Sequence, residues 1–312
     1  MGQAIRKIAL LPAVIALALP LLAASPAQAQ ATRTWVSGTG DNTKNCSRTT
    51  PCQTFSGALA KTAPGGEINC LDPGDFGTVN ITFSVTISCE AGTAGILVTE
   101  GAAGITINAA TTDVVTLRGL DIDGQGSGVA GIQILSAKAV HIEKTAIRNF
   151  RSGSTAATGI TTTPLGSVTI FLFIADTVIS DNDYGIRLRS GGGFKVASLK
   201  NVAITGSTQD GLELAGGNNI YANVTGSIIL GNGDRAVVVD SGSTANIERS
   251  MLANNGVALV TDGIIRISGN NIYNNTAAIA IGPGGKLQSD GTNKHGNSNG
   301  GAQVPNASFA EY

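Results

Sequence analysis

The chain has 312 residues and a formal net charge of −1, and only 13% of its residues are charged. This composition excludes the clustered basic surface that nucleic acid requires, so no nucleic-acid partner is expected. The 42 glycines and the abundant threonine, asparagine and β-branched residues favour short strands and tight turns over helices. All-β chains of about 200 to 250 residues commonly form one domain, so a single elongated domain is compatible with this length.

Residues 1–29 have the pattern of a secretory signal peptide. Arg6 and Lys7 precede an apolar run, and Ala27-Gln28-Ala29 offers a small-residue cleavage site. The alternative is an uncleaved membrane anchor, because the run approaches the length of a span. Cleavage would remove both basic residues and no acidic one, which changes the net charge from −1 to −3. The mature chain is then expected to be secreted or periplasmic, without a membrane span.

Residues 30–66 are expected to form an N-terminal strand and a capping helix. The stretch TFSGALAK, Thr54 to Lys61, is the one convincing short helix after the signal peptide. It precedes the repeats, where a solenoid needs a cap over the open end of its core.

Four cysteines, Cys46, Cys52, Cys70 and Cys89, predict two disulfides in an exported protein. Three pairings are possible. We favour Cys46 with Cys52, which closes a short loop, and Cys70 with Cys89, because the triplets INC and ISC that end in them recur 19 residues apart. A zinc site is the rival interpretation, but these spacings match no common ligand pattern, so no metal is assigned.

Residues 67–300 contain a repeated Gly/Ala-apolar-x-apolar unit. Its copies are GITI at 104, GIQI at 131, GITT at 159, GIRL at 185, GLEL at 211, AVVV at 236, GVAL at 256 and AIAI at 278. The first apolar positions are 105, 132, 160, 186, 212, 237, 257 and 279, which lie 20 to 28 residues apart. Repeats of this length bury an apolar face only by stacking on one another.

A second unit, with two apolar residues five positions apart, alternates with the first. Its copies include Leu117 with Ile122, Ile142 with Ile147 and Leu199 with Ile204. The frame of a leucine-rich repeat is absent, and propeller blades run to about 40 residues. The pattern therefore predicts an all-β parallel β-helix of about eight to ten coils. Beyond Ile281 it degenerates, and residues 301–312 are expected to form a flexible tail.

The segment from TWVSGTGDNTKNC to PGGEINCLDPGDFG, between residues 34 and 77, resembles the entry segment of secreted right-handed parallel β-helix proteins of the pectin lyase-like superfamily. With the repeats, the resemblance covers about residues 34 to 300. It implies a right-handed β-helix and leaves the activity open, because the superfamily contains lyases, hydrolases, epimerases, adhesins and proteins with no assigned reaction. The Asp-Asp and Gly-His-Gly motifs of its pectin hydrolases are missing here.

Stacking of the repeats predicts three ion pairs between adjacent coils. The expected partners are Arg118 with Glu143, Asp123 with Arg148, and Arg187 with Glu213. Such cross-strand pairs contribute about 0.2 to 1 kcal/mol each and are easily mistaken for active-site groups.

The stretch ISDNDYGIRLR, Ile179 to Arg189, carries the candidate site. Asp181, Asp183, Arg187 and Arg189 are the candidate catalytic residues, and Tyr184, Asp210 and Glu213 are the candidate binding residues. Asp181, Asp183 and Asp210 are also the best candidates for calcium, which takes about six to eight oxygen ligands. The plainer interpretation is structural, because asparagine and aspartate suit tight turns and stacked asparagines form ladders.

The leading hypothesis for function is therefore an exported, non-catalytic β-helix scaffold that binds glycan or another envelope component. The alternative is a polysaccharide lyase or epimerase that acts on uronic-acid polymers, and calcium is a cofactor only under this alternative. A third possibility is a module that assembles through the exposed strand edges of its C-terminal coil.

Overall fold

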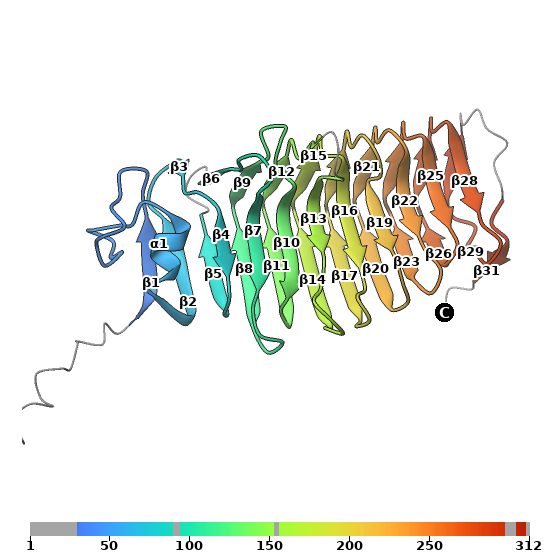
Figure 1. Ribbon diagram of the computed structural model, residues 1–312. Helices are drawn as coiled ribbons and strands as arrows, with labels where there is room; N and C mark the ends of the chain where they lie inside the picture. The colour runs from blue at the N-terminus through green and yellow to red at the C-terminus, as the bar shows by residue number, and fades with distance from the viewer. Residues whose placement is uncertain (1–29, 90–93, 153–155, 297–303, 310–312) are drawn as a thin grey trace, which may run out of the picture. The chain divides into compact units, whose positions relative to one another are not determined.

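The computed structural model describes residues 30–89, 94–152, 156–296 and 304–309. The predicted signal peptide, residues 1–29, lies outside the described residues. All strands belong to the compact unit Ala31–Tyr312, and they form three parallel sheets (Figure 1). No helix within the described ranges is both long and apolar enough to cross a membrane.

The three sheets have twelve, ten and nine strands, and we call them sheets 1, 2 and 3. Sheet 1 contains β1 (Ala31–Val36), β2 (Thr62–Cys70), β5 (Val85–Ser88), β8 (Val114–Arg118), β11 (Ala139–Glu143), β14 (Ile170–Ala175), β17 (Lys195–Lys200), β20 (Ile220–Thr225), β23 (Thr244–Glu248), β26 (Ile264–Ser268), β29 (Lys286–Ser289) and β31 (Ala307–Ser308).

Sheet 2 contains β3 (Gly74–Asp75), β6 (Ala94–Leu97), β9 (Leu120–Asp123), β12 (Ala146–Arg148), β15 (Val178–Ser180), β18 (Ala203–Thr205), β21 (Ile228–Leu230), β24 (Met251–Ala253), β27 (Asn271–Tyr273) and β30 (Lys294–Gly296). Sheet 3 contains β4 (Val79–Ile81), β7 (Ala103–Asn108), β10 (Ala130–Ser136), β13 (Thr158–Thr162), β16 (Tyr184–Arg189), β19 (Leu212–Ala215), β22 (Arg235–Val239), β25 (Val257–Thr261) and β28 (Ala277–Ile281).

The chain passes through sheets 1, 2 and 3 in turn, and the next pass lies directly beside the last. The Gly/Ala-apolar unit forms sheet 3, and the five-residue unit spans the corner between sheets 1 and 2. Ile186 is the register partner of Leu212, and both are completely buried. The predicted parallel β-helix, with its column of stacked aliphatic side chains, is confirmed.

One position of the predicted repeat is wrong. The stacked residue on β25 is Leu259, which is paired with Val237 and Ile279, whereas Val257 is paired with Arg235. Val257 is only half-buried, whereas Ala258 and Leu259 are buried in the core. GVAL is therefore displaced by two residues from the register that its sequence suggested.

Two sharp turns in each coil require a left-handed backbone. The turn between sheets 1 and 2 contains Asp176 (φ 51°) and Asn201 (φ 53°), and the turn between sheets 2 and 3 contains Asp181 (φ 58°) and Asn254 (φ 55°). Aspartate and asparagine tolerate this conformation better than most residues. The predicted turn role of the segment around Asp181 is confirmed.

Buried amides stack behind the second turn. The ladder positions are Asn182, Ser207, Asn232, Asn255 and Asn275. Asn232 and Asn255 each donate through Nδ2 to the Oδ1 of the next asparagine, over 2.9 Å. The same amides donate to backbone carbonyls of the preceding coil, so they satisfy groups that the turns leave unpaired. The predicted asparagine ladder is confirmed, although Ser207 interrupts it.

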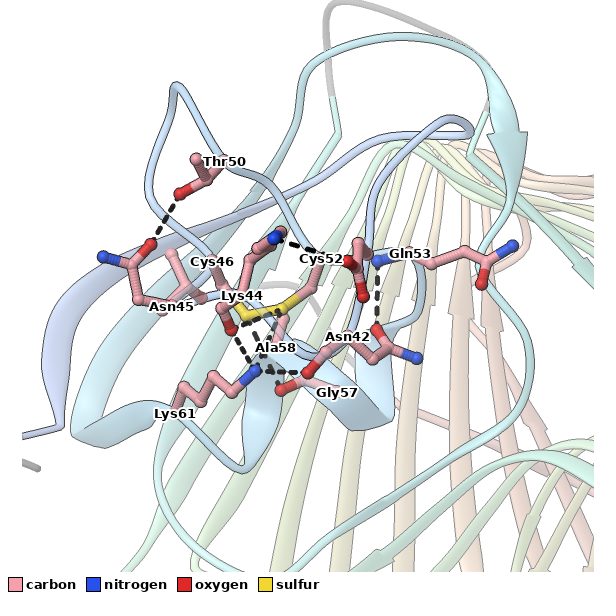
Figure 2. The surroundings of a disulfide bond; sticks show 12 residues. Asn42, Lys44, Asn45, Cys46, Thr50, Cys52, Gln53, Gly57, Ala58 and Lys61 are labelled. Carbon is pink, nitrogen blue, oxygen red and sulfur yellow. Dashed lines mark hydrogen bonds and ion pairs between the residues drawn. A yellow bond between two sulfur atoms is a disulfide. The ribbon is translucent and has the colours of Figure 1, made fainter.

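The N-terminal end carries the predicted short helix, α1 (Phe55–Leu59), capped by the Thr54 hydroxyl. Beside it, a disulfide joins Cys46 to Cys52 and closes a loop (Figure 2). Figure 2 also shows the Lys61 ammonium directed at the segment that leads into this loop, where it donates to the backbone carbonyls of Asn42 and Lys44. Loop and helix are therefore held as one unit.

The second disulfide joins Cys70 to Cys89, with their Cα atoms 4.8 Å apart. Cys70 ends β2, and β2 pairs with β5, which ends one residue before Cys89. Both favoured pairings are thus confirmed.

The C-terminal end continues the sheets beyond Ile281. Strand β29 pairs with β26, and the two-residue strand β31 pairs with β29. Residues 304–309 of the predicted tail are described, and Ala307–Ser308 has a defined place on sheet 1.

Candidate functional site on sheet 3

The candidate site lies on the outer face of sheet 3, across β16 and β19. Ile186 and Leu188 point into the core, so strand alternation turns Arg187 and Arg189 outward. Arg187 is the register partner of Glu213 on the next coil.

Arg187 is held by two neighbours. Its guanidinium forms an ion pair with Glu213, and it lies over the Tyr184 ring, 4.2 Å from the ring centroid. The side chains of Arg187 and Glu213 are only 17% and 11% exposed, so the pair is largely shielded from solvent. Three of the seven sequence candidates therefore form one compact structural cluster.

The other two predicted ion pairs are also confirmed. Arg118 lies 3.5 Å from Glu143, and Arg148 lies 3.3 Å from Asp123. Arg148 contacts Asp121 as well, a partner that the sequence pattern did not indicate.

Asp210 is completely buried and forms a two-pronged pair with Arg235, with both N–O distances at 2.8 Å. Burial raises the pKa of the Asp210 carboxyl, and the hydrogen bond from Arg235 acts in the opposite direction. Sequence reasoning missed Arg235, although the two residues are 25 positions apart, which is one coil. The Asp210 carboxylate is buried inside the protein and does not reach the outer surface.

Asp181 and Asp183 have separate structural partners. Asp181 is largely exposed and pairs with Arg151, whose Nε also donates to the Asp181 carbonyl over 2.8 Å. Asp183 accepts hydrogen bonds from the Thr208 hydroxyl and from the backbone N–H of Ala157. These two aspartates consequently hold the segment before β13 and the turn after β18 in place.

The three aspartates proposed for calcium do not share one pocket. Asp181 faces Arg151, Asp183 faces Thr208, and Asp210 faces Arg235. Among the residues that the structure describes, no group of three or more histidine, cysteine, aspartate and glutamate side chains is placed to hold a metal ion. Calcium binding by these three aspartates would require them to leave their present partners.

Arg189 differs from the other candidates. Its backbone is fixed, because its N–H donates to the Thr162 hydroxyl over 2.7 Å and its carbonyl accepts from the same hydroxyl. Its side chain is exposed, and its guanidinium has no hydrogen-bond or ion-pair partner among the described residues. It is the one candidate cation at this site that is available to an acidic ligand.

The wound parallel strands, the stacked core and the polar turns define a right-handed parallel β-helix. The family described as "Right handed beta helix region" matches residues 158–311. No curated protein sequence matches this chain.

Solved structures of this fold are similar to the chain. The crystal structure of pectate lyase Pel9A has 15% sequence identity and a TM-score of 0.63, over 88% of this chain and 78% of that one. A rhamnogalacturonan lyase has 12% identity and a TM-score of 0.48, over 78% and 74%. The A-module of the Azotobacter vinelandii mannuronan C-5 epimerase AlgE4 has 14% identity and a TM-score of 0.33, over 79% and 91%.

Proposed function

We propose that this protein is an exported, non-catalytic β-helix scaffold that binds glycan or another component of the cell envelope. The proposal rests on one observation: the acidic side chains at the sheet 3 site already have structural partners. Asp181, Asp183, Asp210 and Glu213 each form a contact that holds adjacent coils or turns together. A general base needs a carboxylate that reaches the substrate proton, and these carboxylates are already engaged.

Two further features support a glycan ligand and export. A stack of parallel strands presents a long regular surface to an extended polymer, and pectate lyase Pel9A, which has this fold, is named for a polysaccharide substrate. The two disulfides fit the oxidising conditions outside the cytoplasm, in the periplasm or beyond the cell.

The alternative function is a lyase or epimerase acting on uronic-acid polymers. The observation in its favour is the exposed Arg189 guanidinium, since an arginine forms paired hydrogen bonds with a sugar carboxylate. Under this alternative Arg187 would have to leave Glu213 to reach the substrate, and calcium would be required.

The two functions are separated by measuring binding and turnover on one preparation. The protein from residue 30 onward is incubated with pectate, alginate and a neutral galactan, with and without calcium. Unsaturated ends are followed by ultraviolet absorbance, uronate composition is followed by NMR, and binding is followed by calorimetry. The scaffold proposal predicts binding without either product.

Arg189→Ala and Arg249→Ala form the matched pair for this experiment, because Arg249 is an exposed arginine in a turn on the third coil after that of Arg189. Product formation that is lost in Arg189→Ala and retained in Arg249→Ala, with the fold intact by circular dichroism, would establish the enzyme instead.

A further inference from the structure

The outer face of sheet 1 carries exposed aromatic side chains on neighbouring coils. Phe171 and Phe173 lie on β14, Tyr221 lies on β20, and Phe194 directly precedes β17. Phe173 is 40% exposed and Tyr221 is 42% exposed. Exposed rings on successive strands are uncommon on a surface that serves only the fold, since each costs free energy in water.

Phe173 has one covered ring face and one open ring face. On one side it stacks on His141 of β11, with the ring centroids 4.7 Å apart and the planes 14° apart. On the other side its register partner is Ser198 of β17, whose side chain is too small to cover a phenyl ring. A flat ligand group with apolar C–H bonds fits against that open face.

A row of polar side chains approaches the same place from the C-terminal coils. Arg266 donates to Gln288 on one side and to the Asn246 Oδ1 on the other, and Asn246 donates through Nδ2 to the Asn223 Oδ1 over 2.8 Å. Arginine has no acceptor, so it fixes which way both amides point. The Asn223 amide hydrogens are therefore directed away from Asn246, toward the coil of Ser198, which is the register partner of Asn223 on that side.

The charge of this face favours an anionic ligand. Lys200 follows Ser198 by two residues on β17, so both side chains point outward, and Lys200 is exposed without an ion-pair partner among the described residues. Of the outward positions on β11, β14, β17 and β20, only Glu143 bears a carboxylate, and it pairs with Arg118. The Asn223 amide hydrogens likewise have no partner in the described part of the chain.

We propose that Phe173, Ser198, Lys200 and Asn223 form a binding subsite for a uronate sugar of an acidic polysaccharide. The sugar's C–H face lies on the open face of Phe173, and its carboxylate accepts hydrogen bonds from Asn223 and Lys200. This inference rests on the proposed glycan-binding function and assigns it to sheet 1.

The test uses the protein from residue 30 onward and three oligosaccharide probes: oligogalacturonate, oligomannuronate and neutral oligogalactose. Binding is measured by calorimetry for the wild type, Phe173→Ala, Asn223→Asp, Arg189→Ala and Arg249→Ala. The first two substitutions should each weaken uronate binding at least ten-fold. Asn223→Asp replaces the amide donor with a carboxylate that repels the uronate. Phe173→Ala removes the ring face on which the sugar stacks.

Arg249→Ala is the matched control, because it removes an exposed arginine from the turn between β23 and β24 and should leave uronate binding unchanged. Arg189→Ala tests sheet 3 as the alternative location of the site. Unchanged melting temperatures of the two sheet 1 variants show that lost binding is not lost folding. The neutral probe should bind at least ten-fold more weakly than either uronate.

Four outcomes would overturn the inference. Loss of uronate binding in Arg189→Ala alone would move the site to sheet 3 and leave the proposed function standing. Equal binding of the neutral probe would reject the acidic class. A dimer in light scattering that Phe173→Ala dissociates, without glycan binding, would assign the face to a second copy of the chain. No binding of any probe by the wild type would overturn the inference and would leave the proposed function only with an envelope ligand other than these glycans.

Discussion

The cluster around Arg187 on sheet 3 and the proposed subsite on sheet 1 use their polar side chains in different ways. On sheet 3, Arg187 is paired with Glu213 and covers Tyr184, and Asp210 is buried against Arg235. On sheet 1, Lys200 and Asn223 keep donors directed outward beside the exposed ring of Phe173.

This difference shows that the density of charged residues is a poor guide to a site in a stacked fold. Charged residues one coil apart lie side by side and form ion pairs. Most charged side chains of residues 179–189 are therefore engaged in contacts between coils. The subsite proposed on sheet 1 lies where the sequence contains few charges. Variants of matched residues on the two sides test this contrast.

The largest effect is expected at Asp210. Asp210→Asn removes the charge partner of Arg235 from a buried position and should reduce the free energy of unfolding by about 3 kcal/mol, as expected for breaking a buried pair. Asp181→Asn makes the same chemical change at an exposed pair and should cost about 0 to 1 kcal/mol. Urea unfolding measures both, and equal losses would contradict the buried role of Asp210.

A smaller, pH-dependent effect is expected at Lys195. Its side chain occupies an inward position between Ile170 and Ile220, and its ammonium donates to backbone carbonyls that include those of Ser190 and Gly193. Burial lowers the pKa of Lys195 from 10.5 to about 8.

The sign of the Lys195 effect follows from proton binding. Between pH 8 and 10.5 the unfolded chain holds a proton on Lys195 that the folded chain has released, so stability should rise with pH across this interval. Urea unfolding at several pH values measures the slope, with Lys195→Met as the variant that lacks it. An identical slope in Lys195→Met would show that other groups cause the change.

A gain of about 1 kcal/mol is expected from completing the asparagine ladder. The Ser207 hydroxyl is buried and has no hydrogen-bond partner among the described residues, and the asparagines on neighbouring coils lie at the same position. Ser207→Asn should raise the unfolding midpoint, whereas Ser207→Ala should leave it nearly unchanged. Destabilisation by Ser207→Asn would mean that the turn has no room for the amide.

The smallest effect is expected in the salt dependence of glycan binding. Because Lys200 is exposed, its attraction for a uronate should be screened by salt and contribute about 0.5 kcal/mol. Lys200→Gln should therefore flatten the dependence of oligogalacturonate affinity on ionic strength, measured by calorimetry. Lys286→Gln, at the exposed start of β29, is the control and should leave the dependence unchanged.

Much of the fold was predictable from local pattern. A parallel coil repeats its inward positions at nearly regular spacing, so the stacking of Ile186 on Leu212 and the pairing of Arg187 with Glu213 followed from the repeat. The register prediction failed at Val257, because GVAL offers two apolar residues of which only Leu259 reaches the core position beside Val237. Arg235 escaped notice because it lies at the start of a strand, outside the apolar unit.

The candidate site was only partly predictable. The cluster of Tyr184, Arg187 and Glu213 comes from neighbouring residues and one coil spacing, which a repeat makes visible. The sheet 1 subsite joins Phe173, Ser198 and Asn223 from three coils, and none of these residue types is distinctive alone.

The sequence by itself determined the winding of this protein, since its alternating apolar positions, left-handed turn residues and stacked asparagines leave one economical way to bury the core. Only the tertiary structure decided which outward side chains pair with each other and which remain without a partner. The physical reason is that burial of apolar residues depends on the short-range periodicity of the sequence. Whether a charged group or an amide is available to a ligand depends on the neighbour one coil away and on the direction in which that neighbour's donors point.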